Sequence, residues 1–189
     1  DEYKNPPVTG MGDIKVSHSG NDNPMDNNIY IEFGSSLKII ANDPSLSMYL
    51  KSNAKAEIFG TLILEGQIQN SINSEDPYSI HFKSGSKLIQ KCPGNIFNTT
   101  GAYNSAVFES GSLLDIQSST ALSPFALESP YSKVIFEDNS KVVMNSTSSN
   151  ALKLSGRIYS DLEINSDLVI NEIIISDCFI RKLQVNQSA

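Results

Sequence analysis

Apolar and polar residues alternate in short runs along this chain, and small polar residues separate the runs. Ile80 and Phe82, for example, would point to one face of a strand while His81 points to the other. No segment keeps the apolar spacing of an α-helix, and the helix formers Ala and Glu are not grouped. The pattern therefore predicts an all-β protein with almost no helix.

One turn recurs along the chain. In each copy a large apolar residue is followed by a charged residue, a small polar residue, Gly or Asn, and then Ser or Ala before the next strand-like run. The ungapped copies are Leu50–Ile58 (LKSNAKAEI), Phe82–Gln90 (FKSGSKLIQ), Phe108–Ile116 (FESGSLLDI) and Phe136–Met144 (FEDNSKVVM), and degenerate copies begin at Phe33 and Leu154. Gly and Asn adopt positive φ more readily than other residues, so the chain would bend at the fourth position.

A turn that recurs at a loose period predicts stacked coils, because each coil has to bend where its neighbours bend. We therefore predict a parallel β-solenoid of about six irregular coils over residues 29–189, preceded by an extended segment at residues 1–28. The first residues of the copies would form one internal column, made of Phe33, Leu50, Phe82, Phe108 and Phe136. A β-sandwich is the alternative, because strands spaced every ~8–12 residues are also typical of that fold.

The pattern over about residues 29–170 resembles the coils of right-handed parallel β-helix proteins of the pectin-lyase-like kind, especially those of surface adhesin passengers. For the enzymes of this kind, the resemblance implies clustered carboxylates at the site of sugar cleavage. The chain has no Asp–Asp pair, no Trp to stack on sugar rings, and arginines only at Arg157 and Arg181. We therefore expect a non-enzymatic protein, with a polysaccharide-active β-helix enzyme or a tailspike-like glycan- or receptor-binding domain as the alternative.

Charge and composition restrict the partners and the location. A net charge of −7 with scattered basic residues disfavours nucleic acid and anionic membrane surfaces as partners. No apolar run is long enough to cross a bilayer, so we expect no membrane insertion. Sequons for N-glycosylation begin at Asn98, Asn145 and Asn186, and with the polar, Asn- and Ser-rich composition they favour a secreted or cell-surface protein.

We expect no catalytic, cofactor or metal site. The only histidines are His18, in the N-terminal segment, and His81, on the solvent side of a predicted strand. Oxygen ligands gather in residues 20–28 (GNDNPMDNN), at Asp22, Asn23, Asp26 and Asn27, but without the spacing of an EF-hand, which favours a polar turn over a calcium site.

The two cysteines, Cys92 and Cys178, are separated by several predicted coils. Coils stack at ~4.8 Å, and a disulfide requires Cα atoms within ~7 Å of each other. The solenoid therefore predicts that the two cysteines do not form a disulfide within one chain.

The two ends of the chain differ in polarity. Residues 1–28 are polar and contain three prolines, whereas residues 161–185 form the most apolar part of the chain. An apolar, strand-rich end leaves an edge that needs a partner. We expect the N-terminal segment of one copy to reach the C-terminal edge of the next, giving a head-to-tail homo-oligomer or filament.

A second contact surface is predicted in the longer loops, where binding residues are often found. These loops are residues 70–78, 92–105 and 118–131, which carry Tyr78, Tyr103 and Tyr131. They would suit a glycan or a surface receptor. The expected function is therefore structural or adhesive, with self-association as its main partner interaction.

Overall fold

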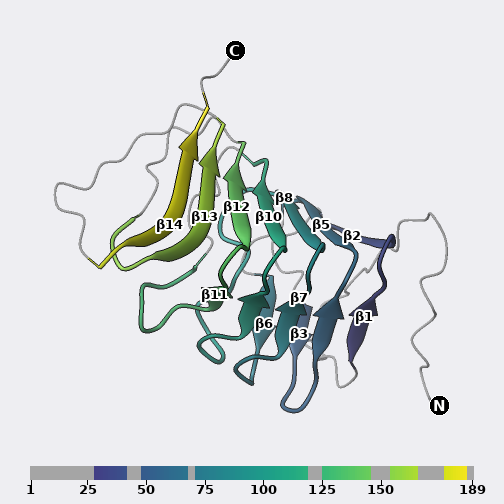
Figure 1. Cartoon of the computed structure of the whole chain (residues 1–189). Helices are drawn as coiled ribbons and strands as arrows, with labels where there is room; N and C mark the ends of the chain where they lie inside the picture. The colour runs from purple at the N-terminus through teal and green to yellow at the C-terminus, as the bar shows by residue number, and fades with distance from the viewer. Residues whose placement is uncertain are drawn as a thin grey trace, which may run out of the picture.

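The computed structural model describes residues 28–41, 48–67, 71–118, 125–145, 154–165 and 177–186, which fold as an all-β parallel solenoid (Figure 1). No helix occurs within these ranges. Every strand pairing is parallel, which excludes the antiparallel β-sandwich that the sequence left open.

Three sheets run along the solenoid. The seven-stranded sheet contains, in spatial order, β2 (Ser36–Ala41), β5 (Thr61–Gly66), β8 (Lys87–Lys91), β10 (Leu113–Ile116), β12 (Lys141–Met144), β13 (Ile158–Ile164) and β14 (Phe179–Val185). The five-stranded sheet contains β1 (Ile29–Ile31), β4 (Ala56–Ile58), β7 (Ile80–Phe82), β9 (Ala106–Phe108) and β11 (Val134–Phe136). The two-stranded sheet pairs β3 (Met48–Leu50) with β6 (Ile72–Ser74).

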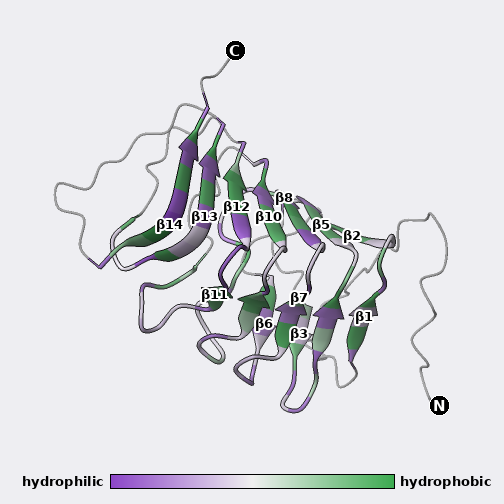
Figure 2. Ribbon diagram, viewed as in Figure 1, coloured by the Kyte–Doolittle hydropathy of each residue, from purple (hydrophilic) through white to green (hydrophobic). Residues whose placement is uncertain are grey.

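The core consists of side-chain columns that run from coil to coil. Along the strands, apolar residues point inward and polar residues point outward, so the two colours alternate in Figure 2. The strand register of the seven-stranded sheet stacks one such column, made of Leu37, Leu62, Leu88, Leu114, Val142, Leu162 and Leu183. Burial of these columns is the main source of stability, since no helix covers the sheets in the described part of the chain.

The recurring turn has the conformation that the sequence predicts. Its fourth residue has positive φ at Asn53 (72°), Gly85 (81°), Gly111 (82°) and Asn139 (65°). The next residue donates its backbone N–H to the carbonyl three residues earlier, as Ser112 does to Glu109 at 2.9 Å. The residue after the one with positive φ is buried wherever it is Ser, because its side chain points into the coil as the next strand begins.

The predicted aromatic column is correct for its last three members and wrong for its first two. Phe82, Phe108 and Phe136 stack in one inner column, but Ile31 and Ile58 precede them in the register. Phe33 is exposed because the turn at Gly34 begins at Ile31, two residues earlier than the sequence alignment places it. Leu50 is buried, but in β3 of the two-stranded sheet.

The solenoid makes about four turns, so the prediction of about six was wrong. One cause is that the same turn serves two corners of the coil, which accounts for one of the extra coils. Gly85 lies between the five-stranded and the seven-stranded sheet, whereas Asn53 lies between the two-stranded and the five-stranded sheet. The copies at Gly34 and Asn53 therefore belong to one coil and do not mark two.

Candidate functional site

Two of the three loop tyrosines meet on the solenoid surface. The rings of Tyr103 and Tyr131 have centroids 5.2 Å apart, with 60° between their planes, and both are about half exposed. The loops align because the backbone N–H of Asn104 donates to the carbonyl of Ser132 at 2.8 Å, one coil further on. Tyr78 is also exposed and lies on the preceding coil, where its N–H donates to the carbonyl of Asn104 at 2.8 Å.

The two rings form one wall of an open cleft with a volume of about 400 Å³. The lining residues are Tyr103, Ala126, Leu127, Glu128, Tyr131 and Arg157. Small-molecule sites have volumes of this order and combine an apolar lining with a few polar groups. We therefore call these six residues the tyrosine cleft and take it as the candidate functional site.

A buried lysine lies against Tyr103 of the tyrosine cleft. The ammonium of Lys133 donates to the carbonyls of Gly101 at 2.7 Å and Ala102 at 3.2 Å, and it lies 4.6 Å from the centroid of the Tyr103 ring. Burial lowers the pKa of Lys133 below the ordinary value of 10.5. The carbonyls and the ring face of Tyr103 both favour the charged ammonium, so Lys133 places a positive charge next to Tyr103.

Arg157 is the one cation among the six residues of the tyrosine cleft, and it is only 4% exposed. Its Nε and Nη1 atoms are buried and have no hydrogen-bond partner. The nearest carboxylate oxygen, on Glu128, lies 4.0 Å from Nη1, and the side chain of Glu128 is 65% exposed. A buried donor without a partner costs on the order of 1–3 kcal/mol, so this arrangement is unfavourable unless something else accepts those hydrogen bonds.

The position of Arg157 follows from a displaced turn. The residue closes a turn like those of the repeat, with its N–H donating to the carbonyl of Leu154 at 3.1 Å. In the preceding copy Ser140 closes the turn directly before β12, but the register pairs Lys141 with Asp161. The later turn therefore ends three residues earlier along the coil than its neighbour. Arg157 consequently packs over the ring of Phe125, 5.5 Å from its centroid.

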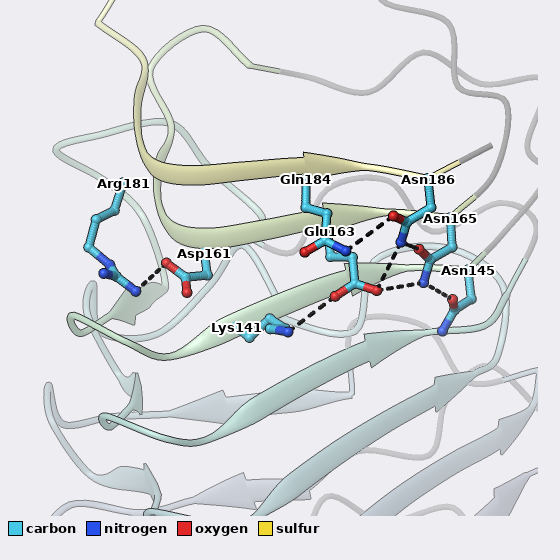
Figure 3. A network of polar contacts seen from close by, with 8 residues as sticks. All are labelled: Lys141, Asn145, Asp161, Glu163, Asn165, Arg181, Gln184 and Asn186. Carbon is cyan, nitrogen blue, oxygen red and sulfur yellow. Dashed lines mark hydrogen bonds and ion pairs between the residues drawn. The ribbon is translucent and has the colours of Figure 1, made fainter.

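A separate polar network lies on the outer face of the seven-stranded sheet at its C-terminal end (Figure 3). The amide of Asn186 donates to Asn165 at 2.5 Å, and the amide of Asn165 donates to Asn145 at 2.8 Å. The amide of Asn145 donates in turn to Asp115 at 2.6 Å. This asparagine ladder (Asn145, Asn165 and Asn186) ties successive coils together, which is a structural role.

The acidic residues of the same face are also paired between coils. Glu163 lies 3.1 Å from the ammonium of Lys141, and Asp161 forms an ion pair with Arg181 (Figure 3). The hydrogen bond from Asn165, and then that from Lys141, lower the pKa of Glu163 below its ordinary value. The contact between Lys141 and Glu163 links β12 to β13, and that between Arg181 and Asp161 links β14 to β13.

His81 belongs to a charged cluster on the outer face of the five-stranded sheet. Its Nδ1 lies 2.9 Å from Glu109, and its Nε2 lies 2.9 Å from the carbonyl oxygen of Tyr78. The ammonium of Lys83 donates to Glu109 at 2.8 Å and lies 3.5 Å from Glu57. This cluster of His81, Lys83, Glu109 and Glu57 links three adjacent strands of the five-stranded sheet.

The other predicted site residues are distributed along the chain. Asn98 accepts hydrogen bonds from the N–H and hydroxyl of Thr100, at 3.0 Å and 3.1 Å, whereas the sequon amides of Asn145 and Asn186 lie in the asparagine ladder. His18 and the oxygen-rich turn with Asp22, Asn23, Asp26 and Asn27 lie outside the described residues. The described ranges contain no cluster of His, Cys, Asp and Glu that could hold a metal ion.

Neither Cys92 nor Cys178 forms a disulfide. Cys92 is fully buried in the core, whereas Cys178 is half-buried beside β14. Burial raises the pKa of the Cys92 thiol to about 11. Cys92 is therefore a structural core residue and not a reactive one.

No family model, curated protein or solved structure matches the chain. None of the described residues forms a helix that could cross a membrane.

Sequence reasoning found Tyr103 and Tyr131 but missed Lys133 and Arg157. Arg157 could have been noticed, because Ser or Ala stands at the corresponding place in the ungapped copies of the turn. A long cation in place of a small buried residue has to find room elsewhere, which indicates a local change in packing. Lys133 carries no such signal, since it precedes an ordinary alternating strand.

Proposed function

We propose that the chain is a non-enzymatic structural or adhesive protein that associates head to tail through the ends of its solenoid. The single observation that carries this proposal is the exposure of β14, where Leu183 is 54% and Val185 is 66% exposed. Both residues end inner columns, because they pair with the buried residues Leu162 and Ile164 of β13. Exposed apolar side chains on a terminal strand favour the addition of another strand.

The opposite end of the same sheet offers a strand edge, although its inward residues Leu37 and Ile39 are only 8% and 6% exposed. In the described part of the chain, β2 and β14 are the two terminal strands of the seven-stranded sheet. If β14 of one copy pairs in parallel with β2 of the next, Leu183 would stack on Leu37 and Val185 on Ile39. The inner columns would then continue from one copy into the other with the same kind of side chain.

The outer side chains are compatible with the same register. It would place Lys182 beside Ser36 and Gln184 beside Lys38, so no two like charges would face each other across the junction. The two ends are different surfaces, which makes the contact heterologous, and a heterologous contact that does not close produces a filament.

The N-terminal segment and the location of the protein are part of this proposal. Residues 1–28 would reach the neighbouring copy, although residues 1–27 lie outside the described residues. The resemblance to pectin-lyase-like surface adhesins and the sequon at Asn98, which lies in a surface loop, support a secreted or cell-surface protein.

The test of self-association is light scattering of the full chain over a range of concentrations. We expect a mass that grows with concentration, and we expect the inward Leu183→Asp variant to remain a monomer because a carboxylate would be buried at the junction. Gln184→Asp places the same charge one residue away on the outer face and should still assemble. A full chain that stays monomeric, or two variants that behave alike, would contradict the proposal.

A polysaccharide-active enzyme remains the alternative function. Its best carboxylate candidates among the described residues are Asp161 and Glu163, which are separated by Leu162 and so lie on the same face of β13. Both carboxylates form ion pairs, with Arg181 and Lys141 respectively. A screen on acidic polysaccharides decides between the two functions. Turnover that is abolished by Asp161→Asn or Glu163→Gln would replace the structural proposal with an enzymatic one.

A further inference from the structure

We propose that protonated His81 holds the surface loop that carries Tyr78, and that the loop is released when the imidazole loses its proton. The contact that holds the loop is between Nε2 of His81 and the backbone carbonyl oxygen of Tyr78, at 2.9 Å. Tyr78 is 54% exposed, so the surface that it forms would change with pH. This device lies on the five-stranded sheet and does not depend on the head-to-tail assembly proposed above, which joins the ends of the seven-stranded sheet.

Both ring nitrogens of His81 face hydrogen-bond acceptors. Nδ1 lies 2.9 Å from Oε1 of Glu109, on the side of the ring away from the Tyr78 carbonyl. The carbonyl oxygen and the ionised carboxylate can only accept hydrogen bonds. A neutral imidazole has one N–H and can serve one of these acceptors, whereas the imidazolium has two and serves both. The geometry is therefore that of a charged His81.

The charges around the ring also balance only when His81 is protonated. The neighbouring charged groups are Glu109, which follows β9, Lys83, which follows β7, and Glu57 of β4, while the β9 residue in register with His81 is the apolar Val107. The ammonium of Lys83 donates to the same oxygen of Glu109 at 2.8 Å and lies 3.5 Å from Glu57. Two carboxylates thus face one ammonium, and the imidazolium supplies the second positive charge.

Loss of the proton should break the contact with Tyr78 and keep the contact with Glu109. A proton left on Nε2 would turn the lone pair of Nδ1 toward a charged carboxylate. A proton left on Nδ1 turns the lone pair of Nε2 toward an uncharged carbonyl, which repels it less. The neutral ring should therefore be the Nδ1–H tautomer, which no longer donates to Tyr78.

The backbone at Tyr78 depends on such a contact. Its φ of 51° is disfavoured for a residue with a large side chain, so neighbouring groups have to hold it. The peptide unit between Tyr78 and Ser79 is held at its carbonyl by His81 and at its N–H by the carbonyl of Ser105, at 3.1 Å. Releasing the carbonyl removes one of these two contacts, so the peptide unit can turn and move the exposed tyrosine with it.

The proposal is tested by NMR of the full chain, from pH 5 upward until the ring has lost its proton. A His18→Gln variant leaves His81 as the only histidine, so its ring nitrogens can be assigned. We expect protons on both nitrogens at acidic pH and on Nδ1 alone after the titration. Exchange of the Ser79 amide, corrected for the intrinsic effect of pH, should become about tenfold faster over the same titration.

Two results would overturn the proposal. A neutral ring that keeps its proton on Nε2 would mean that His81 still donates to Tyr78. A Ser79 amide whose protection does not follow the titration of His81 would mean that the imidazole does not hold the loop.

Charge variants identify the group that controls the loop. Lys83→Gln removes the competing cation and should raise the pH at which Ser79 loses protection by about half a unit, whereas Glu109→Gln should lower it by a similar amount. Glu137→Gln, at the same motif position one copy later, should leave it unchanged. His81→Gln should show fast Ser79 exchange at every pH. Shifts of the two charge variants in one direction, or a pH-dependent Ser79 in His81→Gln, would assign the control to another group.

Discussion

The ring of Phe82 lies parallel to the ring of Phe108, with 4.3 Å between their centroids and 8° between their planes. Phe136 continues the stack on the other side of Phe108, at 4.9 Å and 28°. The rings repeat at about the spacing of the coils, because each is the last residue of its strand and enters the same turn. Phe108 is therefore in contact with aromatic rings on both sides.

Replacing Phe108 with Ala should lower the free energy of unfolding by about 3–5 kcal/mol, because it leaves a cavity in the middle of the stack. Phe33→Ala is the matched control. Phe33 lies on the surface, so its loss should change stability by less than about 0.5 kcal/mol. Urea unfolding followed by circular dichroism measures both, and similar losses in the two variants would contradict the register described here.

The sequence predicted this stack correctly only where the first residue of the turn motif is also the last residue of its strand. Phe82, Phe108 and Phe136 each stand three residues before a Gly or Asn with positive φ, and so does Ile31. Phe33 is the first residue of the degenerate copy FGSSLKI, but it stands directly before Gly34. The distance to the turn was therefore a better guide to burial than the residue type.

The candidate site was predictable in part for a similar reason. Tyr103 and Tyr131 are exposed aromatic residues in loops that recur at the coil period, so sequence could place them on one surface. The position of Arg157 depends on a turn that ends three residues early relative to the strand register, and that register exists only in the folded chain.

The conformation of the turn can be tested at Gly111, which has a φ of 82°. Gly111→Ala should lower the free energy of unfolding by about 1–2 kcal/mol, because an L-residue other than Asn or Asp is disfavoured at positive φ. Gly111→Asn should cost less, since Asn139 adopts a φ of 65° at the same place in the next copy. Both variants add a Cβ that approaches the hydroxyl of Ser84, so this contact is common to the two.

The two cysteines should differ in reactivity. Burial raises the pKa of Cys92 to about 11, so almost no thiolate is present at neutral pH, whereas Cys178 is only half-buried. We expect a thiol reagent to label Cys178 in the native protein and Cys92 only after denaturant is added, as measured by mass spectrometry of peptides. Peptide mapping without reductant should find no Cys92–Cys178 bond, and rapid native labelling of Cys92 would contradict its place in the core.

Acid should weaken the charged cluster around Glu109. Burial raises the pKa of Glu109, but the hydrogen bonds from Lys83 and His81 outweigh this effect, so the pKa lies below the ordinary value of 4.5. A carboxylate whose pKa is lower in the folded state stabilises the fold above its unfolded pKa, and that stabilisation is lost as the pH falls through the folded pKa. Native stability should therefore decrease below about pH 4.5 in part through Glu109.

Glu109→Gln removes this contribution and should lower the free energy of unfolding at neutral pH by about 1 kcal/mol. Its loss relative to the wild type should shrink as the pH falls below about 4.5, because the wild-type carboxylate is then protonated too. Glu137→Gln is the control, since Glu137 occupies the same motif position one copy later and is exposed. Urea unfolding of the three proteins at several pH values checks this, and a Glu109→Gln loss that does not depend on pH would show that the ion pairs do not stabilise the fold.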